Sequence, residues 1–214
     1  FRGKSRGGLY GDVMEMLDWS TGQILDTLAE LGLEEKTIVI LTSDNGPWND
    51  LPDRMLAGGV QRWHTGSPGP YSGSKGTTLE GGCRVASFVR WPGTIPSGRV
   101  SAEMAATLDL YATLITLGGG TVKPHADGYD LTDFLTGKTD NSPRDTFFYG
   151  SGGRPQAVRV GPWKLREVDG VTLHNLDEDP SERYDRAEEF PEKVAELKKL
   201  IDDFSNDTGA GRRI

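Results

Sequence analysis

The sequence predicts an α/β fold, made of a sheet with flanking helices, followed by a small C-terminal antiparallel subdomain with a closing helix. Two observations support this prediction. Early in the chain, a segment with helical periodicity leads directly into a β-branched apolar run, which is one arm of an α/β sheet. Late in the chain, short strand-like segments alternate with Gly, Pro or Asp, which indicates an antiparallel meander. We place the boundary near residue 143, so that residues 1–143 and 144–214 form the two parts.

The first part alternates helix and strand. Apolar side chains recur at helical spacing over residues 9–31, which predicts a helix. Residues 37–42 are a continuous apolar run, typical of a strand buried on both faces in a parallel sheet. Residues 84–91 predict a second strand, and residues 108–117 and 130–135 predict short helices.

The second part carries four strand candidates and a final helix. The strands are expected at residues 146–149, 156–160, 163–168 and 171–176. Residues 191–204 have one apolar stripe at helical spacing, so an amphipathic helix should close the subdomain.

Composition excludes several classes of function. The chain has 214 residues and a formal net charge of −8, and an acidic protein repels nucleic acid and anionic membranes. It has no run of about 18 apolar residues, so no membrane span is expected. The one cysteine cannot form an internal disulfide, and no two histidines have helical metal-ligand spacing, so a zinc site is not expected.

The segment of residues 43–82 is rich in Gly, Pro, Ser and Asn, and long loops in compact domains are usually functional or disordered. The sequence TSDNG at residues 42–46 directly follows the first strand, where α/β sheets bind ligands. Asp44 and Asn45 offer hard oxygen donors suited to Ca²⁺ or Mg²⁺. The alternative is a simple turn, because Asn-Gly is a common turn pair.

Near the end of the same segment, Lys75 lies between glycines and can present its ammonium to an oxyanion as a compact charge. The surroundings are similar to a phosphate loop. Ser74 and Gly76, however, stand where that motif needs a glycine and a hydroxyl residue, so nucleotide binding is not expected. The alternative for Lys75 is a solvated surface lysine.

Seven segments together resemble the sulfatases, and most closely the arylsulfatase and N-acetylgalactosamine-6-sulfatase group. Each segment is weak alone, but they occur in the family's order and cover nearly the whole chain. They are YGDV at 10–13 with LD at 17–18, TSDNG at 42–46, GTTLEGGCRV at 76–85, WPG at 91–93, DGYDL at 127–131, GPWKL at 161–165 and LDEDPSE at 176–182.

The resemblance implies an alkaline-phosphatase-like sheet and a sulfuric ester hydrolase that acts on a sulfate ester, with sulfated sugars among the candidates. It implies that Asp44 and Asn45 are two ligands of a calcium ion and that Lys75 contacts the sulfate. The family uses a formylglycine made from a Cys/Ser-x-Pro/Ala-x-Arg motif, whose hydrated aldehyde attacks sulfur while fixed cations stabilise the oxygens. Family habit favours the periplasm or the exterior, whereas the chain's own residues leave the compartment open.

The nucleophile motif is absent from these residues. Cys83 is followed by Val85 and Ser87 where Pro or Ala and Arg are needed, and no serine has Pro or Ala two places on. We therefore expect the formylglycine and the other calcium ligands on a missing N-terminal segment, and an inactive chain when it is alone. We also expect an exposed apolar face and strand edge, and association with the missing half or with another copy.

Two other functions stay open at this stage. One is a non-catalytic binding or assembly protein derived from a sulfatase, and the other is a phosphate or phosphonate ester hydrolase of the same superfold. Residues 46–72 are expected to shape substrate choice. Four side chains there are candidate substrate contacts, with plain packing as the alternative: Trp48, Trp63, His64 and Tyr71.

Overall fold

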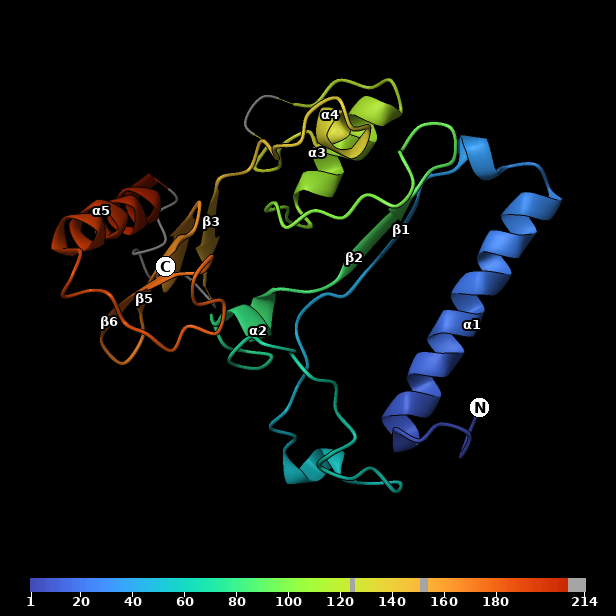
Figure 1. Cartoon of the computed structure of the whole chain (residues 1–214), viewed down its shortest axis with the longest axis horizontal. Coiled ribbons are helices and arrows are strands. Elements are labelled where there is room, and N and C mark those ends of the chain that lie inside the picture. The colour runs from blue at the N-terminus through green and yellow to red at the C-terminus, as the bar shows by residue number, and fades with distance from the viewer. Residues whose placement is uncertain (124–125, 151–153, 208–214) are drawn as a thin grey trace.

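The computed structural model describes residues 1–123, 126–150 and 154–207. Its elements match most of the predicted ones within a few residues (Figure 1). In chain order the helices and strands are α1 (Gly8–Glu30), β1 (Val39–Thr42), α2 (Glu80–Cys83), β2 (Ser87–Arg90), α3 (Asp109–Leu117), α4 (Thr132–Leu135), β3 (Thr146–Tyr149), β4 (Ala157–Val160), β5 (Trp163–Glu167), β6 (Val171–Asn175) and α5 (Pro191–Asp207). None of the helices within the described ranges is long and apolar enough to cross a membrane.

Strand β1 forms a two-stranded antiparallel ladder with β2, in which Val39 pairs with Arg90 and Thr42 with Ser87. All four residues of β1 are half-buried. The strand itself was predicted correctly, but its expected burial on both faces, typical of a parallel sheet, is wrong. A strand is covered on both faces only when helices or another sheet pack there, and β1 has one neighbouring strand in the described part of the chain.

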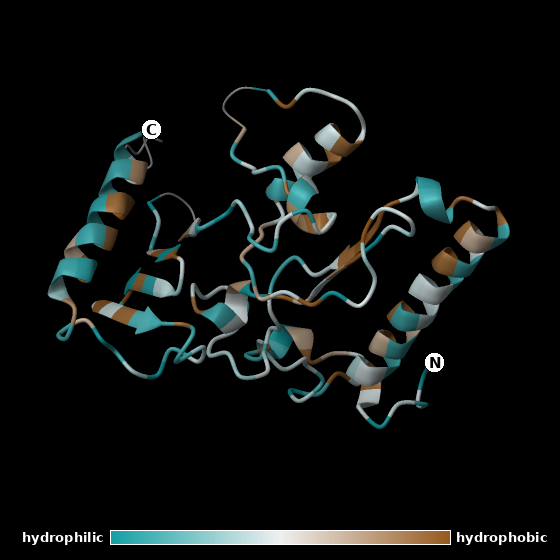
Figure 2. Ribbon diagram, turned by 45° about the horizontal axis from the view of Figure 1, so that its top comes forward, coloured by the Kyte–Doolittle hydropathy of each residue, from teal (hydrophilic) through white to brown (hydrophobic). Residues whose placement is uncertain are grey.

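Helix α1 forms as predicted, yet most of its large apolar side chains are exposed to water. Val13 is 54% exposed and Ile24 is 57% exposed, and Figure 2 shows hydrophobic segments spaced along the helix. The buried residue of α1 is Asp12, whose carboxylate accepts hydrogen bonds from the backbone N–H groups of Gly3 at 2.7 Å and Ser5 at 2.8 Å. The expected exposed apolar face is therefore present, while the association that it would drive stays a prediction.

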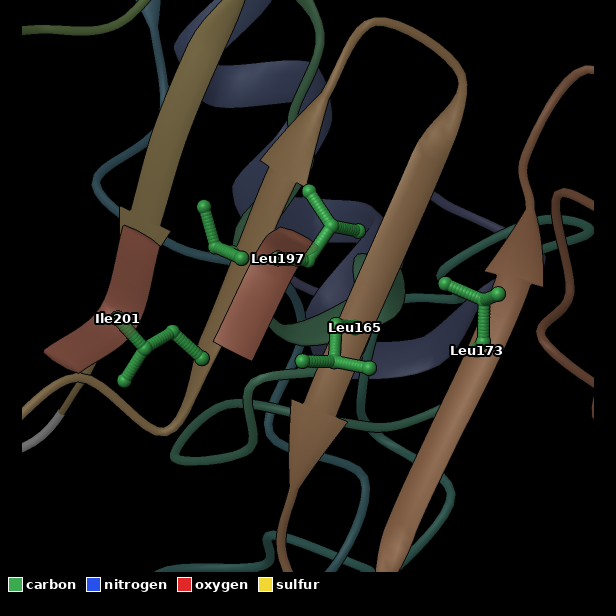
Figure 3. Close-up of a cluster of buried hydrophobic side chains, with 5 residues drawn as sticks. Leu165, Leu173, Leu197 and Ile201 are labelled. Atoms are coloured by element: carbon green, nitrogen blue, oxygen red, sulfur yellow. The ribbon is translucent and has the colours of Figure 1, made fainter. Parts of the chain in front are cut away.

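The C-terminal subdomain is a four-stranded antiparallel meander in the order β3-β4-β5-β6, with α5 across one face (Figure 1). Both the meander and the closing helix were predicted. Five fully buried side chains form its core, and each contributes roughly 1.5–3 kcal/mol by leaving water (Figure 3). They are Val158, Leu165 and Leu173 from the sheet and Leu197 and Ile201 from α5.

A buried ion pair crosses the boundary near residue 143. The guanidinium of Arg144 binds the carboxylate of Asp109 through two bonds, of 2.8 Å from Nε and 2.5 Å from Nη2. Asp109 starts α3 and is fully buried, and it also accepts the backbone N–H groups of Ala106 and Tyr129, each at 2.8 Å. The division into residues 1–143 and 144–214 stays a prediction, with this pair as a firm link between the two parts.

Candidate active-site loops

Two loops meet at the end of β1. The first is residues 43–49, and the second is residues 72–83, which includes α2. Two backbone hydrogen bonds join them, from Gly46 N to Gly82 O at 3.0 Å and from Lys75 N to Pro47 O at 2.9 Å. The Ser74 hydroxyl adds a third link, since it donates to Pro47 O at 3.0 Å. The structure thus brings the predicted metal-binding turn and the predicted anion-binding lysine onto one joined pair of loops.

Glycine is required at this junction because backbone meets backbone there. A Cβ added to Gly46 would lie 1.8 Å from the carbonyl oxygen of Gly81, and one added to Gly82 would lie 2.5 Å from the carbonyl oxygens of Ser74 and Thr77. Real Cβ contacts are never so short, so only a residue without a side chain fits. The glycine clusters in the sequence therefore mark the place where the two loops touch.

Asp44 and Asn45 keep oxygen atoms available for a cation. The Oδ1 atom of Asp44 accepts the backbone N–H of Asn45 at 2.9 Å, and Asp44 is exposed. The Nδ2 atom of Asn45 donates to Gly46 O at 2.9 Å, so its Oδ1 lies on the other side of the amide. Carboxylate and amide oxygens fit calcium. Among the described residues no group of three or more His, Cys, Asp or Glu could hold a metal, so these two residues fit part of a site.

The exposed side chain of Lys75 lies near an aromatic ring and a second cation. Its Nζ is 5.6 Å from the centre of the Trp48 ring, and the guanidinium of Arg54 is 5.8 Å from the same ring. A cation this close to an aromatic face is attracted by the ring's quadrupole. Two positively charged side chains, Arg54 and Lys75, therefore lie near the Trp48 ring beside the loop junction.

The other three candidate contacts lie in two different places. The rings of Trp63 and His64 pack edge-on with centroids 4.0 Å apart, and both lie against Gly8 at the start of α1. The Nδ1 atom of His64 accepts the backbone N–H of Gln61 at 3.0 Å. Tyr71 lies instead under the guanidinium of Arg84, 4.7 Å from its ring centre. Their role as substrate contacts stays a prediction, while each has a packing partner here.

Sequence reasoning missed the buried Glu80, which begins α2. Its Oε1 accepts from Lys164 Nζ at 2.8 Å and from the Tyr149 hydroxyl at 3.0 Å, and Arg159 lies 3.5 Å from its Oε2. Burial raises the pKa of Glu80, but the charge and hydrogen bond of Lys164, the charge of Arg159 and the Tyr149 bond outweigh it, so the pKa is lowered. Alternation along β5 puts Lys164 on the face opposite Leu165, but no signal in the sequence shows that this lysine meets Glu80.

Cys83 has no environment that would activate it as a nucleophile. Part of the residue is exposed, but burial of the thiol raises its pKa. Lys164 opposes that shift, while the carboxylates of Glu80 and Glu182 add to it. An elevated pKa leaves less of the reactive thiolate.

Comparison of the whole sequence with known protein families gives a match. The model of the Sulfatase family matches residues 5–120, more than half of the chain. This chain belongs to the sulfatase family. The loop junction at Gly46 and Gly82 lies inside the matched range.

Individual relatives agree with this assignment. Steryl-sulfatase of Rattus norvegicus is 40% identical over 170 residues, which are 78% of this sulfatase chain and 29% of the relative. N-acetylgalactosamine-6-O-sulfatase of Bacteroides thetaiotaomicron is 32% identical over 222 residues, covering 94% of this chain and 43% of the relative. The chain therefore spans less than half the length of both.

A solved structure shows the fold of the sulfatase chain. A Bacteroides thetaiotaomicron protein, described for the metabolism of multiple glycosaminoglycans, superposes with a TM-score of 0.78 and 29% identity. The match covers 96% of this chain and 46% of the solved one. The predicted alkaline-phosphatase-like α/β fold is confirmed, with the described residues forming part of it.

Proposed function

We propose that this chain supplies calcium ligands and a sulfate-binding lysine to the active site of a sulfuric ester hydrolase. The observation that carries the proposal is the loop junction, where Lys75 N binds Pro47 O at 2.9 Å and Gly46 N binds Gly82 O at 3.0 Å. These bonds join the Asp44-Asn45 turn to the Lys75 loop. A cation ligand pair and an ammonium carried by two joined loops suit the recognition of a sulfate ester.

Asp44 and Asn45 would hold the calcium ion through the oxygens that their local hydrogen bonds leave available. The ion would supply positive charge against sulfate oxygens. Lys75 adds a second positive charge as a compact donor group. The bond of its backbone N–H with Pro47 O fixes the point from which the exposed lysine side chain leaves the loop.

The substrate that we propose is a sulfated sugar. Arg54 and Lys75 both lie beside Trp48, so the approach to the junction favours a ligand with anionic groups. One relative is named for an N-acetylgalactosamine-6-O-sulfate ester, and the solved relative for glycosaminoglycans, which agrees with this choice. By family resemblance we place the protein in the periplasm or outside the cell.

These residues alone should not hydrolyse the ester by the formylglycine route. The Cys/Ser-x-Pro/Ala-x-Arg motif is not among them, and the raised pKa of Cys83 argues against that thiol as a substitute. We propose that the site is completed by an N-terminal half or by another copy. The exposed apolar residues of α1, such as Val13 and Ile24, support such an association.

The test uses the full-length gene product with nitrophenyl sulfate and a sulfated amino sugar. Lys75→Ala should lower kcat/KM by about 10²–10³-fold, because it removes a positive charge that faces the sulfate. Lys36→Ala, which changes an exposed lysine at the turn before β1, is the matched control and should keep full activity. Equal activity of Lys75→Ala and the parent protein would contradict the proposal.

Two further measurements test the calcium dependence and distinguish the sulfatase from a phosphate ester hydrolase and from a non-catalytic binding protein. A chelator should remove activity and added calcium should restore it, with Asp44→Ala needing more calcium than the parent protein. Preference for nitrophenyl phosphate over the sulfate would favour the phosphate ester hydrolase. Substrate binding without turnover by the full-length protein would favour the non-catalytic binding protein.

A further inference from the structure

The C-terminal sheet has a second, polar face. Strand side chains alternate between faces, and Leu165 faces α5 in the apolar core. Lys164 therefore faces the opposite way, and it is fully buried. Tyr149 of β3 and Arg159 of β4 lie on that same face, as their contacts with Glu80 show. A small sheet thus buries a lysine against an element of the other part of the chain.

Lys164 is shared by two buried carboxylates. Its Nζ lies 2.8 Å from Glu80 Oε1 and 3.0 Å from Glu182 Oε1. The second contact is an ion pair by distance, since Glu182 Oε1 makes no hydrogen bond of acceptable geometry in the described chain. The other oxygen of Glu182 accepts the backbone N–H of Glu80 at 2.6 Å. Glu182 therefore binds the start of α2 directly and again through Lys164.

Glu182 occupies a backbone conformation that few residues adopt. Its φ is 54°, in the left-handed region, where a glutamate is uncommon. Surrounding structure must hold such a residue in place. Its carboxylate does so, by binding Glu80 N, and the preceding residue helps, because Ser181 O accepts the Ser72 hydroxyl at 2.6 Å.

These contacts anchor the Lys75 loop at both ends. Ser72, where the loop of residues 72–83 begins, is bound to Ser181, and Glu80, which starts α2 near the end of the loop, is bound to Glu182 and Lys164. Thr78 adds a contact with Arg166 of β5 at 3.2 Å. The tip of the loop touches the calcium-ligand turn through the bond of Lys75 N with Pro47 O.

We propose that Glu182 and Lys164 of the C-terminal subdomain, acting through Glu80, are positioning residues for Lys75. The inference rests on the proposed function of Lys75 as the sulfate-binding lysine. The subdomain holds the two ends of the loop, and the loop tip holds the ammonium at the site. We call the contacts of Glu182 and Lys164 with Glu80 the clamp. Loss of the clamp would free the tip of the loop and let Lys75 move away from the sulfate.

A double-mutant cycle in the full-length gene product tests the clamp, with Glu182→Gln and Lys75→Ala as the two changes. The glutamine removes the negative charge beside Lys164, and its single oxygen can face either Lys164 or the backbone N–H of Glu80, while its NH2 group faces the other donor. Glu182→Gln alone should lower kcat/KM for nitrophenyl sulfate about tenfold and weaken inhibition by inorganic sulfate to a similar degree. In the Lys75→Ala background it should change kcat/KM by less than about twofold, because the group that it positions is gone.

The outcomes distinguish the two proposals. If Lys75→Ala has no effect, the proposed function fails. If Lys75→Ala has its effect but Glu182→Gln lowers activity by the same factor in both backgrounds, the positioning role fails and Glu182 acts on stability alone. Lys199→Met, which breaks an exposed ion pair with Asp203 on α5, is the control and should change neither rate nor sulfate inhibition.

Amide hydrogen exchange keeps the test valid if Glu182→Gln lowers the yield of folded protein. In the folded fraction, residues 72–83 should exchange at least about tenfold faster than in the parent, with residues 191–207 of α5 unchanged. Unchanged exchange in 72–83 would overturn the clamp. The rescue variant Glu182→Asp keeps the carboxylate, and it should recover part of the protection and of the sulfate inhibition.

Discussion

Each of the two parts of this chain contains a long amphipathic helix, but the apolar side chains of the two helices differ in how far they are buried. Helix α5 buries Leu197 and Ile201 completely against the meander, whereas α1 leaves Val13 54% exposed and Ile24 57% exposed. The difference lies in what packs against the apolar stripe of each helix. The meander that covers α5 is made of four strands that follow one another in the chain, while the described residues leave most of the apolar stripe of α1 uncovered. An apolar stripe therefore predicts a helix reliably but says little about where the stripe is buried.

The largest expected effect comes from removing the core of the packed region. Leu197→Ala should lower the free energy of unfolding by about 2–5 kcal/mol, because it removes buried surface and leaves a cavity in the core. Ile24→Ala, at an exposed position of α1, should change it by less than about 0.5 kcal/mol in these 214 residues. Urea unfolding of both variants measures the contrast. A large loss with Ile24→Ala would show that α1 is packed in solution.

A smaller effect is expected at the loop junction, which lies between the two regions. Gly46→Ala should lower the free energy of unfolding by about 1–3 kcal/mol, because the new methyl group would overlap the carbonyl oxygen of Gly81. Gly22→Ala in α1 is the control, since nothing lies within 4 Å of its added Cβ. It should stabilise the helix by roughly 0.5–1 kcal/mol. Thermal melting of the two variants should therefore shift in opposite directions.

The smallest effect is the pH dependence of stability that comes from Glu80, which links the loop to the C-terminal subdomain. The pKa of Glu80 is lowered from 4.5, because Lys164, Arg159 and Tyr149 outweigh its burial. A depressed pKa means that the carboxylate stabilises the fold above pH 4.5 and that this contribution is lost as pH falls through the folded-state pKa. Glu80→Gln should flatten the acid side of the stability curve, as measured by urea unfolding between about pH 3 and about pH 6. If the free energy of unfolding of Glu80→Gln fell with pH as steeply as that of the parent, the Glu80 carboxylate would contribute nothing to stability in this pH range.

Much of the fold followed from local patterns. The four strands of the meander and α5 were predicted within a few residues, because strand alternation and helical periodicity are written in neighbouring side chains. The order of seven segments indicated the sulfatase family, which the family model confirms. The TSDNG turn and Lys75 were singled out as site candidates from residue type and position, and their ligand roles remain predictions.

Burial, strand pairing and the network around Glu80 were decided by the tertiary structure. The apolar run at β1 looked like the centre of a parallel sheet, yet it pairs antiparallel with β2 and is half-buried. Glu80, Lys164 and Glu182 are far apart in the sequence, and no pattern at one position shows that the lysine lies between the two carboxylates. Periodicity depends on neighbours along the chain and could be determined from the sequence alone. Burial and charge pairing depend on what lies across space, which only the folded chain decides.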